Sequence, residues 1–280
     1  MPQRPIGVST VAYDGRPIDD AFAGIAQAGA GFVEPAFIKG YMDFDETDLS
    51  EAAGAAMARR LRAHGLGCLA ISAHMDQGAP EAAEALARRL RFTAAVGAKI
   101  TITNSTRRLF RDALSRVVEA CLPLAETLGV TIALENPGHG DDDLMPDGRR
   151  GADIVANFAS PWLRINYDTG NTLTHSEGAV RPEDDILHTL PTLCHVHLKD
   201  VRRTPAGWRY VAIGEGELDQ KRIFEALASR PEIPAAIEIP LRLVRGFAAP
   251  PRRDPALPAL AAISDAVRKS LRTCRRFESA

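Results

Sequence analysis

The chain of 280 residues has few of the features that mark membrane, secreted or nucleic-acid-binding proteins. No apolar run approaches the ~20 residues that a transmembrane helix needs, and the first ten residues lack the apolar core of a signal peptide. The formal net charge is only −2, so no basic excess draws the chain toward nucleic acid or anionic membranes. These absences predict a cytoplasmic protein that has neither nucleic acid nor membrane as a partner.

Cysteine is scarce, and the motifs of several large enzyme classes are missing. The four cysteines show no CxxC spacing, which predicts buried free thiols and argues against disulfides or a cysteine-based zinc site. The chain has no GxxxxGK phosphate loop and no GxGxxG that opens a helix after the first strand. It also lacks the GxSxG elbow of the α/β-hydrolases. Neither nucleotide binding nor serine-hydrolase chemistry is indicated.

What the sequence does contain is a regular alternation of strand-like and helix-like segments. Short apolar runs rich in β-branched residues cover 6–10, 31–34, 66–72, 99–103, 130–135, 163–168, 193–197 and 235–239. The clearest helical patterns, with apolar residues at i, i+3 and i+4, cover 18–29, 49–65, 80–97 and 109–129. Eight such strand–helix units predict an α/β protein, a single (β/α)8 TIM barrel over residues 1–280.

Four metal-competent side chains each end one of these predicted strands. They are Glu135, Asp168, His197 and Glu238, separated by 33, 29 and 41 residues, about one strand plus one helix per step. Taken singly, each has a structural explanation, such as a helix cap for Asp168; four such strand ends are hard to explain in that way. Because barrel strands converge at their carboxyl ends, we predict a divalent-metal site. Mn²⁺ or Mg²⁺ suits the oxygen ligands best, with Co²⁺ or Zn²⁺ as alternatives.

Long segments follow three of the predicted strands on the same face as this site. They cover residues 136–151, 198–219 and 240–258. Barrel enzymes build their sites from such loops, so no second domain is needed to explain the length of the chain. The apolar stretch 246–260 would suit a contact with a neighbouring subunit, which leaves a homo-oligomer open.

Five short motifs carry a family resemblance. IALENPG, the DTG of NYDTGN, HVHLKD, IGEGELD and the strand-eight IEI follow one another in this order. Together they resemble the sugar isomerase/epimerase superfamily of xylose isomerase-like barrels, most closely the D-tagatose 3-epimerase and inosose dehydratase type. The resemblance spans essentially the whole chain. It implies that Glu135, Asp168, His197 and Glu238 are the metal ligands, and that Glu135 and Glu238 also move protons in catalysis.

Further residues are predicted to contact the substrate. Arg203, six residues after the ligand histidine, matches the position of a substrate-binding arginine in epimerases of this type. His74 and Glu34 end the third and second predicted strands and would face the same open end of the barrel, its mouth, where the predicted metal site lies. Each also has a structural alternative, which for Glu34 is a salt bridge to Lys39 or a nearby arginine.

The chain departs from the family pattern at Asn171. Many relatives have histidine at this position, in a DTGH sequence, whereas an asparagine amide can only form hydrogen bonds. We predict that Asn171 contacts the substrate and that the enzyme differs from a simple ketohexose epimerase. Lys199 would form a structural ion pair or bind a substrate oxygen, and His195 would be a buried supporting residue.

The predicted reaction is proton abstraction next to a metal-bound carbonyl of a keto-sugar, inosose or polyol ketone. This is the first step of epimerisation and isomerisation, and also of dehydration, so a dehydratase or lyase is the alternative activity. A catalytically inactive metal- or sugar-binding barrel is the alternative of another class.

The same superfamily includes the trinuclear zinc nuclease endonuclease IV. Asn104 and Asn171 stand where that enzyme has histidines, and the segment 208–212 lacks its acidic and histidine ligands. A nuclease is therefore disfavoured, and one metal ion per chain is predicted.

Overall fold

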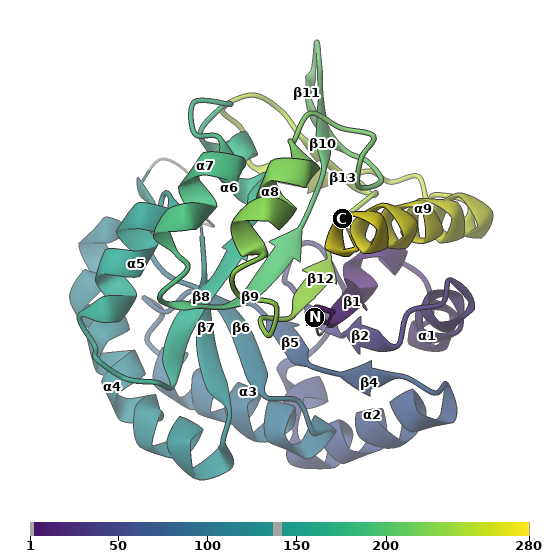
Figure 1. The fold of residues 1–280 in the computed structure, drawn as a ribbon. Helices are drawn as coiled ribbons and strands as arrows, with labels where there is room; N and C mark the ends of the chain where they lie inside the picture. Colours follow the sequence, from purple (N-terminus) through teal and green to yellow (C-terminus); the bar gives the residue numbers. More distant parts are fainter. Residues whose placement is uncertain (1–2, 137–141, 280) are drawn as a thin grey trace.

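The computed structural model describes residues 3–136 and 142–279, and it forms the predicted barrel. Parallel strands curl around one axis with helices outside them (Figure 1). The barrel strands are β1 (Ile6–Ser9), β2 (Phe32–Glu34), β3 (Ala36–Phe37), β4 (Gly67–Cys68), β5 (Ala70–Ala73), β6 (Ile100–Asn104), β7 (Thr131–Glu135), β8 (Leu163–Asp168), β9 (Leu193–Leu198) and β12 (Ala235–Ile237). Nine of these ten strands overlap the eight runs that the sequence predicts as strands, whereas β3 lies just beyond the predicted run 31–34.

The sheet closes on itself where two strands, each split in two, pair along both of their halves. Pro35, which has no N–H to donate, separates β2 from β3, and Leu69 separates β4 from β5. β2 pairs with β4 and β3 pairs with β5, so the order β3-β5-β6-β7-β8-β9-β12-β1-β2-β4 returns to its start. The architecture is the predicted α/β barrel.

Helices connect the strands and cover the outside of the barrel. They are α1 (Ile18–Gln27), α2 (Glu51–Ala63), α3 (Ala82–Val96), α4 (Arg111–Leu128), α5 (Gly148–Ala156), α6 (Thr169–His175), α7 (Pro182–Asp185), α8 (Gln220–Leu227) and α9 (Leu260–Glu278). Short 3₁₀ turns are η1 (Thr10–Tyr13), η2 (Glu46–Leu49), η3 (Arg108–Phe110) and η5 (Ile186–His188). The four predicted helices are confirmed. Two of them end at Gly97 and Gly129, whose φ values of 91° and 60° favour glycine.

A second, antiparallel sheet stands over the carboxyl ends of the barrel strands (Figure 1). It contains β10 (Val201–Thr204), β11 (Gly207–Tyr210), β13 (Leu243–Arg245) and β14 (Pro251–Arg253), in that order. These strands come from the two long segments after β9 and β12, in which the sequence predicts no strands. Gly207 has a φ of 128°, and a Cβ there would overlap the backbone of Arg245. The glycine therefore allows β11 to approach β13.

Ion pairs connect this upper sheet to the barrel. Asp14, which follows η1 and is 4% exposed, accepts hydrogen bonds from Arg253 at 2.8 and 3.0 Å and from Arg242 at 3.2 Å. Arg253 also pairs with Asp43 at 2.8 Å. Because two arginines share one buried carboxylate, the sheet has a fixed position over the mouth.

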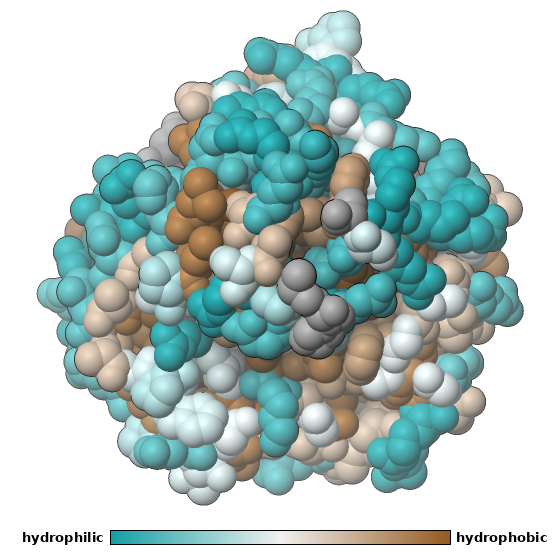
Figure 2. Space-filling view, viewed as in Figure 1, coloured by the Kyte–Doolittle hydropathy of each residue, from teal (hydrophilic) through white to brown (hydrophobic). Residues whose placement is uncertain are grey.

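The barrel has an apolar core and a largely hydrophilic surface, as the ordinary globular composition of the chain predicts. Apolar side chains from the strands and the inner helix faces form one large core cluster, and the four cysteines are free, as predicted. Hydrophilic side chains predominate over α7, α8 and α9 on the face in Figure 2. Within residues 3–136 and 142–279, no helix is long and apolar enough to span a bilayer. Phe247 and Leu257 are 37% and 44% exposed, and the predicted subunit contact in this segment stays a prediction.

Candidate metal centre

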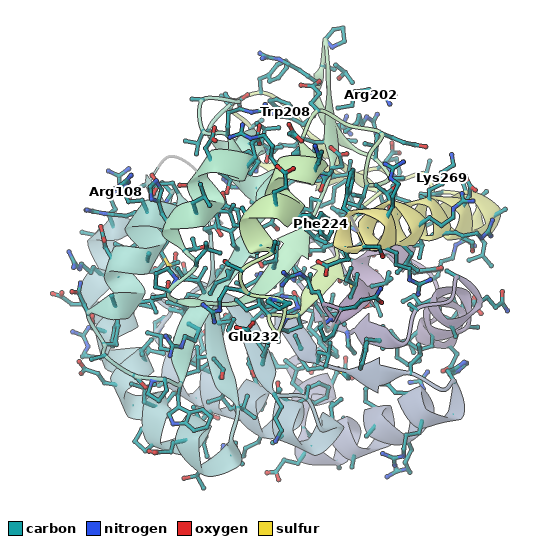
Figure 3. All side chains as sticks on the ribbon, viewed as in Figure 1. Arg108, Arg202, Trp208, Phe224, Glu232 and Lys269 are labelled. Carbon is teal, nitrogen blue, oxygen red and sulfur yellow. The ribbon has the colours of Figure 1, made fainter. Side chains whose placement is uncertain are left out.

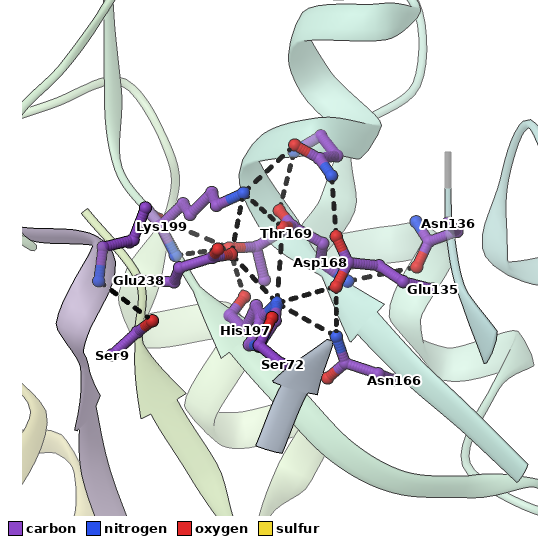
Figure 4. A network of polar contacts seen from close by, with 12 residues as sticks. Ser9, Ser72, Glu135, Asn136, Asn166, Asp168, Thr169, His197, Lys199 and Glu238 are labelled. Atoms are coloured by element: carbon purple, nitrogen blue, oxygen red, sulfur yellow. Dashed lines mark hydrogen bonds and ion pairs between the residues drawn. The ribbon is translucent and has the colours of Figure 1, made fainter. Parts of the chain in front are cut away.

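Four side chains from four barrel strands meet at the mouth of the barrel (Figure 4). One ligand-competent atom from each of Glu135, Asp168, His197 and Glu238 lies within 4.8 Å of the others, and all four side chains are buried. His197 Nδ1 is 2.8 Å from Glu135 Oε2 and 2.9 Å from Glu238 Oε2. Asp168 Oδ2 is 3.7 Å from the same nitrogen. The structure thus brings together the four residues that the sequence predicts as ligands.

This set of donors fits a divalent cation. Three carboxylates so close together repel one another in a buried site, and Asp168 Oδ2 and Glu238 Oε2 have no hydrogen-bond partner among the described residues. Lys199 Nζ lies 2.6 and 2.8 Å from these two oxygens and forms the predicted ion pair with them. The angles of these contacts are not those of hydrogen bonds, so the two oxygens still have no hydrogen-bond donor within the described ranges. One ammonium thus faces three carboxylates. A divalent ion would supply the remaining charge and the missing partners.

The imidazole of His197 is held from behind by Glu34. Glu34 Oε1 lies 3.0 Å from His197 Nε2, so Nε2 donates to the carboxylate and Nδ1 faces the cluster. A metal-binding histidine commonly donates its second N–H in this way, which fixes the ring. His195 Nε2 is 3.5 Å from the other Glu34 oxygen, and both residues are buried.

This position corrects the prediction that Glu34 contacts the substrate. The ring of His197 lies between Glu34 and the carboxylates of the cluster, and Glu34 is only 2% exposed. The alternative of a salt bridge to Lys39 is also wrong, because Lys39 pairs with Glu46 at 3.5 Å. Glu34 instead orients the ring of His197.

Two asparagines that the sequence interpretation missed position side chains of the cluster. Asn166 Nδ2 donates to Glu135 Oε2 at 2.7 Å, and Asn166 Oδ1 lies 2.8 Å from His195 Nδ1. Asn136 Oδ1 accepts a hydrogen bond from the backbone N–H of Asp168 at 3.0 Å. Side chains two residues apart on a strand share a face. The spacing of Asn166 and Asp168 is therefore the signal that indicates the first of these residues.

Asn171 connects a carboxylate to a cation at the mouth. Its Nδ2 donates to Glu135 Oε1 at 3.0 Å, and its Oδ1 accepts from Lys199 Nζ at 3.2 Å. Its backbone N–H donates to Asp168 Oδ1 at 2.8 Å. Asp168 therefore caps α6 with one oxygen and faces the cluster with the other. Asn171 lines the cavity, and its contact with substrate stays a prediction.

The charges of the cluster shift one another's pKa values. Burial lowers the pKa of His197, but the surrounding carboxylates, Glu238 first, outweigh burial and raise this pKa well above its ordinary value. Burial opposes the charged form of Glu238, yet His197 and Lys199 hold its pKa well below the usual range. Burial and the neighbouring His197 place the pKa of His195 well below its ordinary value. His195 is thus neutral, and negative charge is kept at the centre of the cluster.

The cluster opens into a cavity of about 200 Å³. His74 lines this cavity, with Nδ1 2.6 Å from Asn104 Oδ1 and Nε2 2.8 Å from Ser72 Oγ. His74 Nε2 is also 3.5 Å from Glu135 Oε2, so the structure brings this predicted site residue to the mouth. A larger cavity of about 530 Å³ adjoins the first, and His74 and Asn104 line both. The two cavities together therefore have room for the part of a ligand that extends beyond its reacting atoms.

Arg203, by contrast, lies away from the mouth. Its backbone N–H donates to Glu217 Oε1 at 2.7 Å, and its guanidinium carbon lies 5.5 Å from the ring centre of Trp208 and 4.8 Å from that of Phe247. Trp208 belongs to the upper sheet (Figure 3). Because the register of β10 and β11 places Arg203 opposite Trp208, its side chain stacks on these rings. The arginine that lines the cavity is Arg245 of β13, which the sequence interpretation did not single out.

Comparison with known families gives a match over most of the chain. The family described as "Xylose isomerase-like TIM barrel" matches residues 22–267. The chain belongs to this family. The resemblance inferred from the five motifs is confirmed at this level.

A curated protein of named activity is similar to part of this chain. L-ribulose-5-phosphate 3-epimerase of Escherichia coli O1:K1 is 33% identical over 124 residues, which cover 44% of this chain and 39% of the relative. The aligned part is thus about two fifths of that relative's length.

Solved structures share the fold at lower sequence identity. D-allulose 3-epimerase from Methylomonas sp., in complex with D-allulose, is 18% identical with a TM-score of 0.72, and 98% of each chain is covered. A xylose isomerase-like TIM barrel protein from Mycobacterium smegmatis, in complex with magnesium, is 14% identical with a TM-score of 0.72, covering 98% of this chain and 97% of that one. These likenesses establish the fold.

In this xylose isomerase-like barrel, the IGEGELD motif forms a structural loop around Asp200. One Asp200 oxygen accepts hydrogen bonds from the backbone N–H groups of Gly214 and Gly216 at 2.8 and 3.0 Å. The other oxygen accepts from Val201 and Leu218 at 3.0 and 3.3 Å. A Cβ on Gly216 would overlap this carboxylate. The loop therefore fixes the chain just beyond His197 and Lys199.

Gly216→Ala is expected to lower the free energy of unfolding by about 1–3 kcal/mol, since the added methyl group must displace the buried carboxylate. Chemical denaturation followed by circular dichroism measures the change. Gly31→Ala is the matched control, because a Cβ there meets no atom within 4 Å. Equal stability of the two variants would contradict the role assigned to the loop.

Proposed function

We propose that this protein is a metal-dependent sugar isomerase or epimerase, which moves a proton next to the carbonyl of a keto-sugar or inosose. The observation that carries the proposal is the buried cluster at the mouth, in which two glutamates approach one histidine nitrogen within 3 Å. The activity named for the ribulose-phosphate relatives supports it. So do the sugar epimerases among the structural neighbours.

Glu135, Asp168, His197 and Glu238 would hold one divalent ion, Mn²⁺ or Mg²⁺ by preference. When bound, such an ion polarises a ligated carbonyl and stabilises the negative charge that develops as the neighbouring carbon loses its proton. Glu34 keeps the His197 ring in the orientation that ligation needs. Asn166 holds Glu135 through a hydrogen bond of 2.7 Å.

Glu135 and Glu238 are the proton-transfer residues of this proposal. They come from β7 and from the end of β12, which are separated in the sheet by β8 and β9, so their carboxylates reach the mouth from different sides. One carboxylate removes the proton and the other returns a proton to the opposite face, which is epimerisation. Return to the adjacent carbon is isomerisation, whereas loss of a β-hydroxyl is the dehydratase alternative. A positioned general base or acid typically contributes about 10²–10⁴-fold to such a step.

A nuclease with several metal ions receives no support from the geometry. Among residues 3–136 and 142–279, the second group of metal-competent side chains is Glu34, His195 and His197, which shares His197 with the first. Glu34 pairs with His195 Nε2 and His197 Nε2, on the side of the His197 ring that faces away from the carboxylate cluster. We therefore propose one ion per chain.

Metal analysis and solvent-deuterium exchange together test the proposal. The expected result is one divalent ion per chain, and metal-dependent incorporation of deuterium at a carbon next to the carbonyl of a ketose. D-allulose, L-ribulose 5-phosphate and a 3-keto-glucoside form the panel, because proteins similar to this chain are named for these compounds. Bound metal with no exchange on any compound of this panel would favour the inactive barrel instead.

A further inference from the structure

We propose that the mouth contains a subsite for an oxyanion carried by the substrate, and that Arg245 is the residue that binds it. The inference rests on the proposed function, because it names the chemical class of the sugar: a ketose that carries a phosphate or a carboxylate. Arg245 lies on β13 and lines the same cavity as Glu135 and Glu238.

The first observation is a buried positive charge without a negative partner. Arg245 is 7% exposed, and no carboxylate in the described parts of the chain lies within ion-pair distance of its guanidinium. Its Nη1 donates to His175 Nε2 at 2.8 Å, whereas its Nε has no hydrogen-bond partner in those parts. Burial of an unpaired charge is costly unless a partner arrives. An oxyanion provides both the charge and the acceptor oxygens.

The second observation is the charge balance of the mouth. Glu135, Asp168 and Glu238 carry three negative charges. A divalent ion and the ammonium of Lys199, which lies 2.6 Å from Asp168 and 2.8 Å from Glu238, balance them. Glu34 lies behind the ring of His197 and contacts both histidines, so the guanidinium of Arg245 is left as a local surplus of positive charge in the cavity, without a carboxylate partner among the described residues. A neutral sugar leaves this surplus unpaired, whereas one anionic group compensates it.

The third observation is that the guanidinium is held in place before a ligand binds. Arg245 pairs in the antiparallel sheet with Trp208 on one side and Pro251 on the other. A planar guanidinium offers donors in a fork that matches two oxygens of a phosphate or carboxylate. Since strand pairing fixes the backbone and the hydrogen bond to His175 Nε2 holds the guanidinium, the loss of entropy on binding is small.

A matched set of ligands tests the proposal by calorimetry on the Mn²⁺-loaded protein. D-fructose, D-fructose 6-phosphate and D-fructuronate share a ketose frame and differ in the group on the terminal carbon. The expected result is that one or both anionic ketoses bind about tenfold or more tightly than D-fructose. Preference for the phosphate or for the carboxylate identifies which oxyanion the subsite takes. Equal affinity of all three ligands, or binding of neither anionic ketose, would overturn the proposal.

Variants assign the preference to Arg245. Arg245→Gln should abolish the advantage of the anionic ligand, and Arg245→Lys should keep only part of it, because a lysine is a point charge without the fork. Arg252→Gln is the control, since Arg252 is an exposed arginine in the neighbouring strand of the same sheet. An unchanged preference in Arg245→Gln would refute the assignment. If that variant does not fold, the comparison of the three ligands in the unmodified protein and in Arg245→Lys decides.

The outcome is separable from that of the proposed function. Calorimetry reports binding and needs no turnover, whereas the proposed function is judged by deuterium exchange. A protein that exchanges deuterium into neutral ketoses and shows no anion preference keeps its function and loses this subsite. A protein that prefers anionic ketoses without any exchange keeps the subsite and loses the function.

Discussion

Glu135→Gln and Glu238→Gln are each expected to reduce solvent-deuterium exchange into the substrate by about 10²–10⁴-fold. Both carboxylates lie within 3 Å of His197 Nδ1 at the mouth, and an amide at either position can no longer accept a proton at neutral pH. The glutamine keeps the size of the side chain and one acceptor oxygen. The rate of exchange, measured by mass spectrometry or NMR with the ketose panel, gives the result.

Metal content has to be measured beside the rate, because both glutamates are also predicted ligands. A variant that keeps its ion and loses exchange supports a role in proton transfer, whereas loss of both shows that the side chain is needed to bind the metal. Glu225→Gln is the control for a change of charge, since this glutamate is exposed on α8 and pairs only with Lys221 among the described residues. Exchange near the unmodified rate in both site variants, with metal bound, would contradict the mechanism.

Addition of Mn²⁺ is expected to raise the melting temperature of the metal-free protein, and Asp168→Asn should remove most of this increase. The folded state holds four donors within 4.8 Å, and the unfolded chain has no such site. Metal at 100 times its dissociation constant adds about 2.7 kcal/mol to folding stability. For a chain of this size that corresponds to about 5 °C. Differential scanning calorimetry with and without Mn²⁺ measures the increase.

Asparagine is the informative replacement at Asp168 because it separates two roles of the side chain. Asp168 Oδ1 caps α6 by accepting from Asn171 N–H at 2.8 Å, and asparagine is an equally good cap. Oδ2 faces Lys199 and the cluster, and there the charge is lost. The readout is the change caused by metal, not the starting temperature, since less repulsion among carboxylates also alters the metal-free protein. A full Mn²⁺ response in Asp168→Asn would argue against a metal at this cluster.

The cluster of three carboxylates and one histidine could be predicted from the sequence because its members occupy equivalent places in a repeated unit. Each of the four lies at or next to the carboxyl end of a strand, and parallel strands in a barrel present these ends on one face. Local sequence patterns therefore placed Glu135, Asp168, His197 and Glu238 together without knowledge of any contact. His74 reached the mouth for the same reason, as the end of a strand.

Residues beyond the strand ends could not be placed in this way. Arg203 matched a family position by its distance along the chain, yet the β10–β11 register turns it onto Trp208 and Phe247. Arg245 lies seven residues after Glu238, in a segment with no strand pattern, and reaches the cavity only because β13 pairs with β11. Side chains in such segments are directed by pairing between distant parts of the chain.

The sequence by itself determined the barrel, its eight strands and the four residues of the metal cluster, because periodicity and spacing are local properties. The tertiary structure alone decided which side chains surround that cluster. It placed Glu34 behind His197, brought Lys199 against two of the carboxylates and left Arg245 as the buried charge without a carboxylate among the described residues. These relations depend on distances of a few ångströms between segments far apart in the chain, and only packing fixes such distances.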